Sequence, residues 1–258
     1  MASQQVCIGT SGWSYDHWQG VFYPETVAAN RRLAYYQKNF RSVEINSSFY
    51  SLPSAASLRR WYESVSGDFV FAVKASRYIT HMKKLRDPQR TIKTFMSRVE
   101  ILRDKLGPIL FQLPPRWHIN TERLAALFKI LPRGYFYAVE FRDPSWYSER
   151  IYDLLAKNNV AFCIYDLGGI LSPMQVTADF IYIRLHGPEG PYQGQYSGRA
   201  LCRWAERIER WRKEKRAVYC YFDNDEAAHA VRDAARLQKM LRNDGDKRPA
   251  KENSGRRR

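Results

Sequence analysis

The chain has 258 residues, of which 45% are hydrophobic and 14% aromatic, and its formal net charge is +16. A body of this composition can bury a substantial core, which excludes an intrinsically disordered protein. No apolar run reaches the roughly 20 residues of a membrane-spanning helix, so we expect no membrane partner. Residues 1–5 lack the basic and apolar segments of a secretion signal, so we expect a cytoplasmic location.

Short apolar segments alternate with helical segments along most of the chain. In chain order, the predicted strands are Val6–Gly9, Val43–Asn46, Phe69–Ser76, Ile109–Gln112, Tyr137–Arg142, Ala161–Asp166, Ile181–His186 and Val218–Asn224. The segments with apolar residues at helical spacing are Arg31–Phe40, Ser54–Ser66, Thr91–Leu106, Thr121–Leu131, Ser148–Asn158, Arg199–Glu214 and Asp225–Leu241. This order predicts an α/β fold, a single TIM-type (β/α)8 barrel of parallel strands.

Two parts of the chain depart from this pattern. The segment Gly168–Asp179 is short and rich in Gly and Pro, so we predict one degenerate crossover between the sixth and seventh strands. The C-terminal residues are rich in Lys and Arg, and we predict one TIM-barrel domain over 1–242 followed by a basic, disordered tail over 243–258.

Strand parity predicts which side chains point into the barrel, because alternate residues face opposite sides. The predicted inward set is polar and charged: Glu44, Asn46, Lys74, Gln112, Glu140, Arg142, Asp166, Arg184, His186 and Asp223. Barrel interiors are usually filled by Val, Ile and Leu, and unpaired buried ions are costly. We therefore interpret the set as a polar ligand pocket at the carboxyl ends of the strands. The alternative is a self-satisfied ion network that only fills the barrel.

Two kinds of ligand fit these residues. The basic side chains Lys74, Arg142 and Arg184, with His81 from the loop after the third strand, would clamp a phosphate or carboxylate; we favour this ligand because the body of the chain is basic. The predicted substrate-binding set is completed by Gln112, Asn46, Glu44, Asn224, Trp13 and Tyr50. Alternatively, a divalent metal would bind between acidic and imidazole groups, namely Glu44, Glu140, Asp166 and His186, although no local metal-binding motif occurs.

His186 is the strongest candidate for a general acid or base, since imidazole exchanges protons near neutral pH. Glu140 or Asp166 would orient it or act as the partner base. We therefore expect an enzyme, a hydrolase, lyase or isomerase, that acts on an anionic small molecule. The alternatives are a metal-dependent hydrolase or isomerase, and a nucleic-acid-binding protein that uses the basic surface.

A series of short motifs resembles the YecE-like family, a group of bacterial and archaeal domains of unknown function. The motifs, in order over roughly residues 7 to 241, are Gly9–Trp18, Glu44–Tyr50, Phe71–Lys74 with Thr80 and His81, Leu110–Pro115, Glu140–Arg142 with Ser145 and Trp146, Arg184–Gly187 and Tyr221–Asp225. The resemblance implies a single barrel of the triosephosphate-isomerase type and supplies no reaction. Two positions depart from the family pattern: Ser48 stands where we expect Thr, and Asp223 where we expect Asn.

Overall fold

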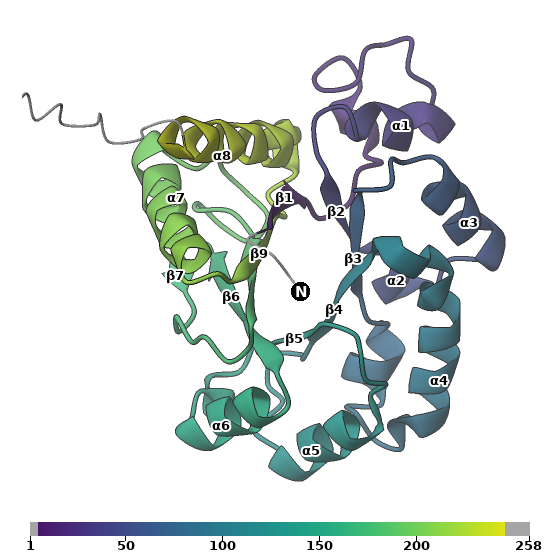
Figure 1. Cartoon of the computed structure of the whole chain (residues 1–258), viewed down its shortest axis with the longest axis vertical. Helices are drawn as coiled ribbons and strands as arrows, with labels where there is room; N and C mark the ends of the chain where they lie inside the picture. The colour runs from purple at the N-terminus through teal and green to yellow at the C-terminus, as the bar shows by residue number, and fades with distance from the viewer. Residues whose placement is uncertain (1–4, 246–258) are drawn as a thin grey trace, which may run out of the picture.

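Eight parallel strands form a ring at the centre of the molecule (Figure 1). The structure, a computed structural model, describes residues 5–245. The strands of the ring are β1 (Val6–Thr10), β2 (Ser42–Ile45), β3 (Val70–Lys74), β4 (Leu106–Gln112), β5 (Tyr137–Glu140), β6 (Val160–Leu167), β8 (Phe180–Leu185) and β9 (Ala217–Phe222). Neighbouring strands pair in the order β1-β9-β8-β6-β5-β4-β3-β2, so the predicted TIM-type barrel is confirmed.

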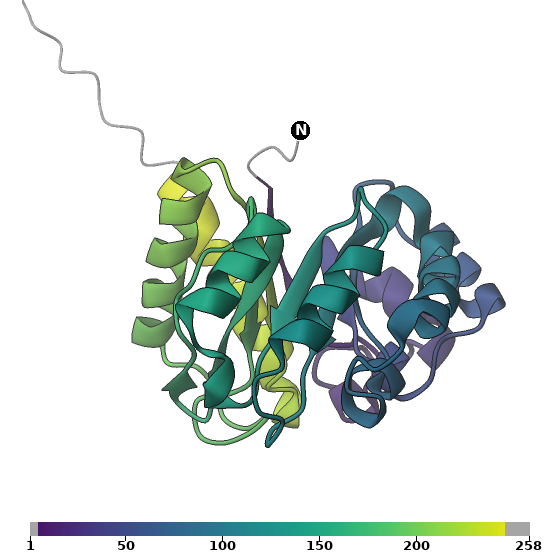
Figure 2. The same cartoon turned by 90° about the horizontal axis from the view of Figure 1, so that it is seen from below.

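The helices lie outside the ring, as the turned view also shows (Figure 2). They are α1 (Arg32–Tyr36), α2 (Ser47–Tyr50), α3 (Ala55–Glu63), α4 (Pro88–Val99), α5 (Thr121–Ile130), α6 (Glu149–Lys157), α7 (Gly198–Lys213) and α8 (His229–Gly245). The helix predicted over Thr91–Leu106 ends at Val99, because the following 3-10 segment is interrupted at Arg103, which has a φ of 48°. The short α2, directly after β2, was not predicted.

The barrel closes at a narrow seam between β1 and β2. The Gly12 N–H donates to the Glu44 carbonyl at 2.8 Å. Lower in the seam, the Tyr36 hydroxyl accepts from the Thr10 N–H at 2.9 Å and donates to the Ser42 carbonyl at 3.1 Å. A Cβ at Gly9 would lie 2.0 Å from the Ser42 carbonyl oxygen, so only glycine lets the two strands approach this closely.

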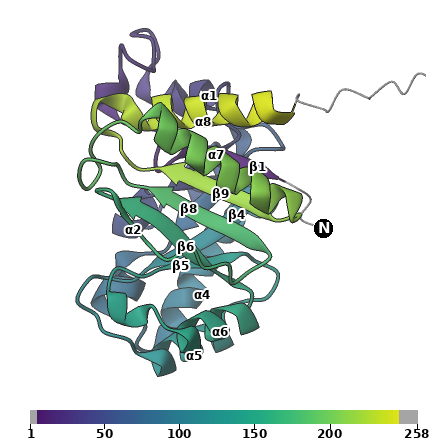
Figure 3. The ribbon, with the colours of Figure 1, turned by 90° about the vertical axis from the view of Figure 1, so that its left-hand side faces the viewer.

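The crossover between β6 and β8 contains a hairpin instead of a helix. β7 (Ile170–Leu171) pairs antiparallel with the end of β6, and the turn uses Gly168 and Gly169 with φ values of 60° and 77°. The chain then runs extended along β6, where the Thr177 hydroxyl accepts from the Phe162 N–H at 2.8 Å. This connection confirms the predicted degenerate crossover. Figure 3 shows α7 and α8 lying side by side on the outside of the ring.

The core has two layers. Outward-facing strand residues such as Ile181 and Ile183 pack with the helices, while Tyr182, between them, points into the barrel. The lower half of the interior holds small and aromatic side chains, including Ala138, Cys163, Tyr182 and Tyr219. Charged side chains fill the upper half, toward the carboxyl ends of the strands.

The described residues end within the segment that the sequence predicts to be a tail. α8 continues to Gly245, and the predicted tail from residue 246 onward lies outside the described residues. Across residues 5–245, no helix has both the length and the apolar character needed to cross a membrane.

Candidate active site at the carboxyl ends of the strands

Arg184, at the end of β8, is the centre of a buried ion network in the upper half of the barrel. Its side chain has no solvent exposure. It donates to Glu44 Oε1 at 2.8 Å, to Glu140 Oε2 at 2.9 Å and to Asp223 Oδ2 at 2.9 Å. These carboxylates come from β2, β5 and the residue after β9, so folding brings together side chains that are far apart in the sequence.

A second cation completes the ion network. Arg142 follows β5, pairs through Nε with Glu140 and stacks over the Tyr165 ring at 4.9 Å. Burial alone would raise the pKa of Glu140, but Arg142 and Arg184 hold it well below the usual range of a glutamate. Gln112 also donates to Glu140 at 2.9 Å. Glu140 is therefore a carboxylate with several donors around it.

His186 links Arg142 to Asp223. The Arg142 guanidinium lies 2.9 Å from His186 Nε2, and Asp223 Oδ2 lies 3.0 Å from Nδ1. Because a guanidinium only donates, Nε2 is the acceptor and Nδ1 carries the proton that is donated to Asp223. The His186 side chain is fully buried, so it lies behind Asp223 and orients this carboxylate. The predicted general acid or base is therefore placed where it can hold the Asp223 carboxylate in position.

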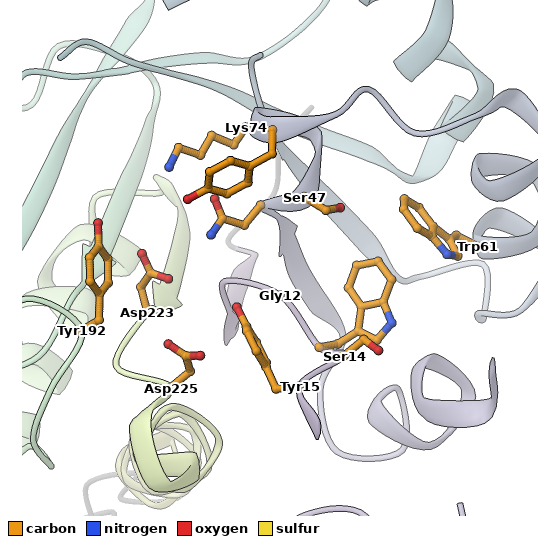
Figure 4. A pocket seen from close by; sticks show the side chains of 12 residues that line it. Gly12, Ser14, Tyr15, Ser47, Trp61, Lys74, Tyr192, Asp223 and Asp225 are labelled. Atoms are coloured by element: carbon orange, nitrogen blue, oxygen red, sulfur yellow. The ribbon is translucent and has the colours of Figure 1, made fainter. Parts of the chain in front are cut away.

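A cavity of about 490 Å³ opens above the ion network (Figure 4). This volume suits a small-molecule ligand. Lys74, Tyr192, Asp223 and Asp225 gather at one end of the cavity, and Trp61 lies at the other. The Trp61 ring packs edge-on against Trp13, with the centroids 4.9 Å apart. The cavity therefore has an ionisable end and an aromatic end.

Lys74, the last residue of β3, extends its amine into the ionisable end. The residue is 5% exposed, and Nζ lies 4.1 Å from the centroid of the Phe49 ring. Burial and the Arg184 guanidinium lower the pKa of Lys74 to about 8. No salt bridge to this amine forms within residues 5–245, although three carboxylates of the site lie close enough to raise its pKa slightly.

Two carboxyl groups of the cavity, those of Asp223 and Asp225, have pKa values that shift in opposite directions. Burial would raise the pKa of Asp223, but Arg184 and the hydrogen bond from His186 lower it. Burial and the nearby Asp223 carboxylate raise the pKa of Asp225. Asp223 is therefore held as a carboxylate, whereas Asp225 binds a proton more readily than an ordinary aspartate.

Two further features mark the cavity wall as a place for a ligand. The Oδ1 atom of Asn46 is buried and has no hydrogen-bond partner in the described part of the chain. Tyr192 has a φ of 67°, rare for a residue with a side chain, and its N–H donates to the His186 carbonyl at 2.6 Å. Strained backbone of this kind is concentrated at functional sites.

The predicted site residues fall into three groups. Four line the cavity, namely Lys74, Asn46, Trp13 and Tyr50. Six lie beneath it, and these are Glu44, Gln112, Glu140, Arg142, Arg184 and His186. His81 lies beside the first group, where its ring packs edge-on against Phe49 with centroids 4.9 Å apart. The lower group is an ion network in which most groups are paired, although Arg184 Nε is buried without a hydrogen-bond partner among the described residues, and the cavity lies above this network.

Asp166 and Asn224 lie outside this arrangement, which corrects their predicted placement. Asp166 is on the outer face of β6 with Phe162 and Ile164, and burial raises the pKa of its carboxyl group. Asn224 donates to the Gly194 carbonyl at 2.8 Å and to Asp233 at 3.0 Å, outside the barrel. The cause is the alternation of side chains, since the neighbouring Tyr165 and Asp223 point inward.

The predicted alternative metal site does not form from its four residues. Asp166 is on the other face of β6, and the oxygens of Glu44 and Glu140 accept hydrogen bonds from Arg184. Among the residues that the structure describes, no group of three or more His, Cys, Asp and Glu side chains is arranged to hold a metal ion.

Sequence reasoning missed several residues of the cavity. Asp223 was placed inward but given no role, and Asp225, Tyr15, Trp61 and Tyr192 were not assigned to the site. Asp225 ends the last motif of the family resemblance, which was the available signal for it. Tyr192 lies in a Gly- and Pro-rich loop whose course the sequence does not reveal.

Comparison with known proteins decides the family. A family model described as "Protein of unknown function DUF72" matches residues 7–256. The chain belongs to the DUF72 family. The UPF0759 protein YunF of Bacillus subtilis is 23% identical over 269 residues, which cover 92% of this chain and 94% of YunF. The UPF0759 protein YecE of Escherichia coli K12 is 29% identical over 147 residues, or 56% of this chain and 51% of YecE. The predicted YecE-like resemblance is thereby confirmed.

Solved structures of the DUF72 family share this architecture. A DUF72 protein of Thermotoga maritima superposes with a TM-score of 0.84 at 30% identity and covers 92% of this chain and 99% of its own. A DUF72 protein of Enterococcus faecalis, at 20% identity, has a TM-score of 0.79 with 92% and 96% coverage, which supports the fold alone. The descriptions of these relatives name a family and no reaction.

Proposed function

We propose that this DUF72 protein is an enzyme that binds an anionic small molecule in the cavity above the ion network and acts on it by acid–base chemistry. The observation that carries the proposal is the amine of Lys74, which is buried at the cavity wall without a salt-bridge partner in the described residues. A buried cation gains most from a partner of opposite charge, which a bound phosphate or carboxylate supplies.

The local potential supports an anionic ligand. Burial, followed by the charges of Lys74 and Arg77, lowers the pKa of His81 to about 4, and Arg142 acts in the same direction. Several cations are thus close enough to His81 to disfavour a further positive charge there. The same positive potential would attract phosphate or carboxylate groups.

The acid–base roles in this proposal belong to the carboxyl groups at the ionisable end. Asp223, held as a carboxylate by Arg184 and His186, accepts a proton from the ligand. Asp225, with its raised pKa, donates one. His186 and Arg142 hold Asp223 in position from beneath.

The proposal is tested by titrating the protein with inorganic phosphate and with pyruvate at low salt, and measuring binding by calorimetry. Lys74→Met should weaken the binding of both anions by about tenfold or more, because the buried charge is lost. Lys83→Met is the matched control, since Lys83 lies on the exposed segment after the same strand. Equal affinities for the wild type and both variants, or no binding at all, would overturn the proposal.

A second candidate function, nucleic-acid binding, is favoured by one surface. Arg199, Arg203, Arg207 and Arg210 follow one another at helical spacing on α7. Burial, together with Arg203 and Arg210, lowers the pKa of Arg207, so these like charges are close to one another. Replacing Arg203 and Arg210 with Glu should reduce oligonucleotide binding and flatten its dependence on salt. Unchanged anisotropy of a labelled oligonucleotide would count against this candidate.

A further inference from the structure

We infer that Lys74 is a nucleophilic amine that forms an imine with a carbonyl group of the substrate, and that the substrate is a small aldehyde or ketone that also carries an anionic group. This inference rests on the proposed function, because the same cavity must bind the anion. It adds the chemical class of the substrate and a covalent role for one residue.

The position of Lys74 is that of a nucleophile. A lysine amine in a salt bridge is kept protonated and has no free lone pair. The Lys74 amine has no salt-bridge partner among the described residues; it contacts the face of the Phe49 ring and lines the cavity. Burial and Arg184 lower its pKa to about 8, so roughly a tenth of the molecules carry a neutral amine at pH 7. Desolvation next to another cation is a known way of activating an amine.

Lys105 shows that burial beside an aromatic ring does not by itself leave an amine free. It is 7% exposed, and its Nζ lies 4.3 Å from the centroid of the Tyr62 ring. Its amine, however, donates to the Tyr62 carbonyl at 2.6 Å and to the Val65 carbonyl at 2.7 Å. Lys105 is therefore occupied by structural hydrogen bonds, whereas Lys74 faces a cavity.

The chemistry balances with groups that the cavity supplies. The neutral Lys74 nitrogen attacks the carbonyl carbon and forms a C–N bond, while the C=O π pair moves to oxygen, which takes a proton from Asp225. The positively charged nitrogen then returns one proton to the Asp225 carboxylate and regains a lone pair. This lone pair forms C=N as the C–O bond breaks, and the hydroxyl leaves as water with a proton from Asp225, which gives a protonated imine and an Asp225 carboxylate. No oxidant, reductant or cofactor is needed.

The imine explains why a carboxylate lies beside the amine. A protonated imine draws electrons from the adjacent carbon and acidifies its C–H bond. Asp223 lines the same end of the cavity as Lys74, so its carboxylate faces the space that a substrate bound to the amine would occupy. The bond broken is then a C–H or C–C bond next to the former carbonyl, which places the reaction among lyases or isomerases.

The experiment traps the imine in the full-length protein. Pyruvate, glyoxylate and dihydroxyacetone phosphate are added separately at neutral pH with sodium cyanoborohydride, and peptide mass spectrometry locates the reduced adduct. Lys74 should be labelled about tenfold or more faster than Lys83 or Lys105, because its amine has a lowered pKa and faces the bound carbonyl. Lys74→Met should remove this label and leave slow labelling elsewhere.

The outcomes separate this inference from the proposed function. Lactate and glycerol 3-phosphate carry the same anionic groups without a carbonyl, and they should slow the labelling by competition. If these anions bind in a Lys74-dependent manner but no probe labels Lys74 faster than Lys83, the imine inference fails and the proposed function stands. If they do not bind either, both fail. Fast labelling that Lys74→Met leaves unchanged also overturns the inference.

Discussion

Arg184 Nη2 donates to Asp223 Oδ2 at 2.9 Å, and this bond connects the fully buried ion network to the cavity. Arg184 has no exposed side chain, whereas Asp223 lines the cavity. A ligand in the cavity would contact Asp223 but not Arg184. The charge of Asp223 is therefore set by a group that the ligand does not contact. Because His186 also donates to the same oxygen, the carboxylate is held in one orientation.

We expect Arg184→Met to lower the free energy of unfolding by about 3–5 kcal/mol, because it leaves Glu44, Glu140 and Asp223 without their shared cation. Urea denaturation at neutral pH measures this loss. Arg41→Met is the control, since it removes a solvent-exposed ion pair with Asp68, which should contribute little to stability. Similar costs for the two variants would show that the ion network is not the main support of the upper barrel.

Lys74→Met should stabilise the protein at neutral pH. The folded-state pKa of Lys74, about 8, lies below the unfolded value of 10.5, so burial of its charge opposes folding. This penalty, on the order of 3 kcal/mol, is fully present below about pH 8 and disappears as the pH rises to the unfolded value. Urea denaturation at neutral and alkaline pH should therefore show a gain that shrinks with pH. A pH-independent gain would mean that packing, not charge, is its cause.

His81 should report directly on anion binding. Its imidazole, with a pKa lowered to about 4, is neutral at physiological pH, and its protonation in acid opposes folding. A bound phosphate would offset the surrounding positive charges and raise this pKa. NMR titration of the His81 ring with and without inorganic phosphate measures the change, and the exposed ring of His118 serves as the reference signal. A His81 titration that phosphate leaves unchanged would place the anion elsewhere.

Asp223→Asn should lower the pKa of Lys74 further, because the Asp223 carboxylate is one of the groups that raise it. The amide keeps an oxygen that can accept the proton of His186 Nδ1, so we expect the variant to fold. The pH midpoint of cyanoborohydride labelling at Lys74 should fall below that of the wild type. An unchanged midpoint would show that the two side chains do not interact.

Much of the fold follows from local patterns. All eight predicted strands of the ring form, and the short Gly-rich connection after β6 predicts the missing helix correctly. The predicted helix to Leu106 is too long because its apolar spacing continues through Arg103, where the backbone turns to positive φ. Such a break in a helix depends on packing, so the hydrophobic periodicity of the sequence does not reveal it.

The candidate site was predicted less completely. Parity brought Glu44, Lys74, Glu140 and Arg184 to one end of the barrel, because side chains alternate along a strand. Parity also places Asn224 on the outer side with Phe222, and the structure agrees, so its inclusion among the site residues was wrong. Parity also does not show how far an inward side chain lies from the cavity. His186 and Arg184 are fully buried below the cavity, whereas Lys74 lines it.

By itself, the sequence determined the strand and helix order, the family, and the end of the barrel where charged side chains collect. Hydrophobic periodicity and short motifs reveal these properties, because each of these patterns spans only a few residues. Only the tertiary structure decided which charges neutralise one another and which face a ligand. The reason is that pairing and exposure depend on distances between strands that are far apart in the sequence. Ser42 and Tyr221, for example, are 179 residues apart, and their hydroxyls lie 2.7 Å from each other.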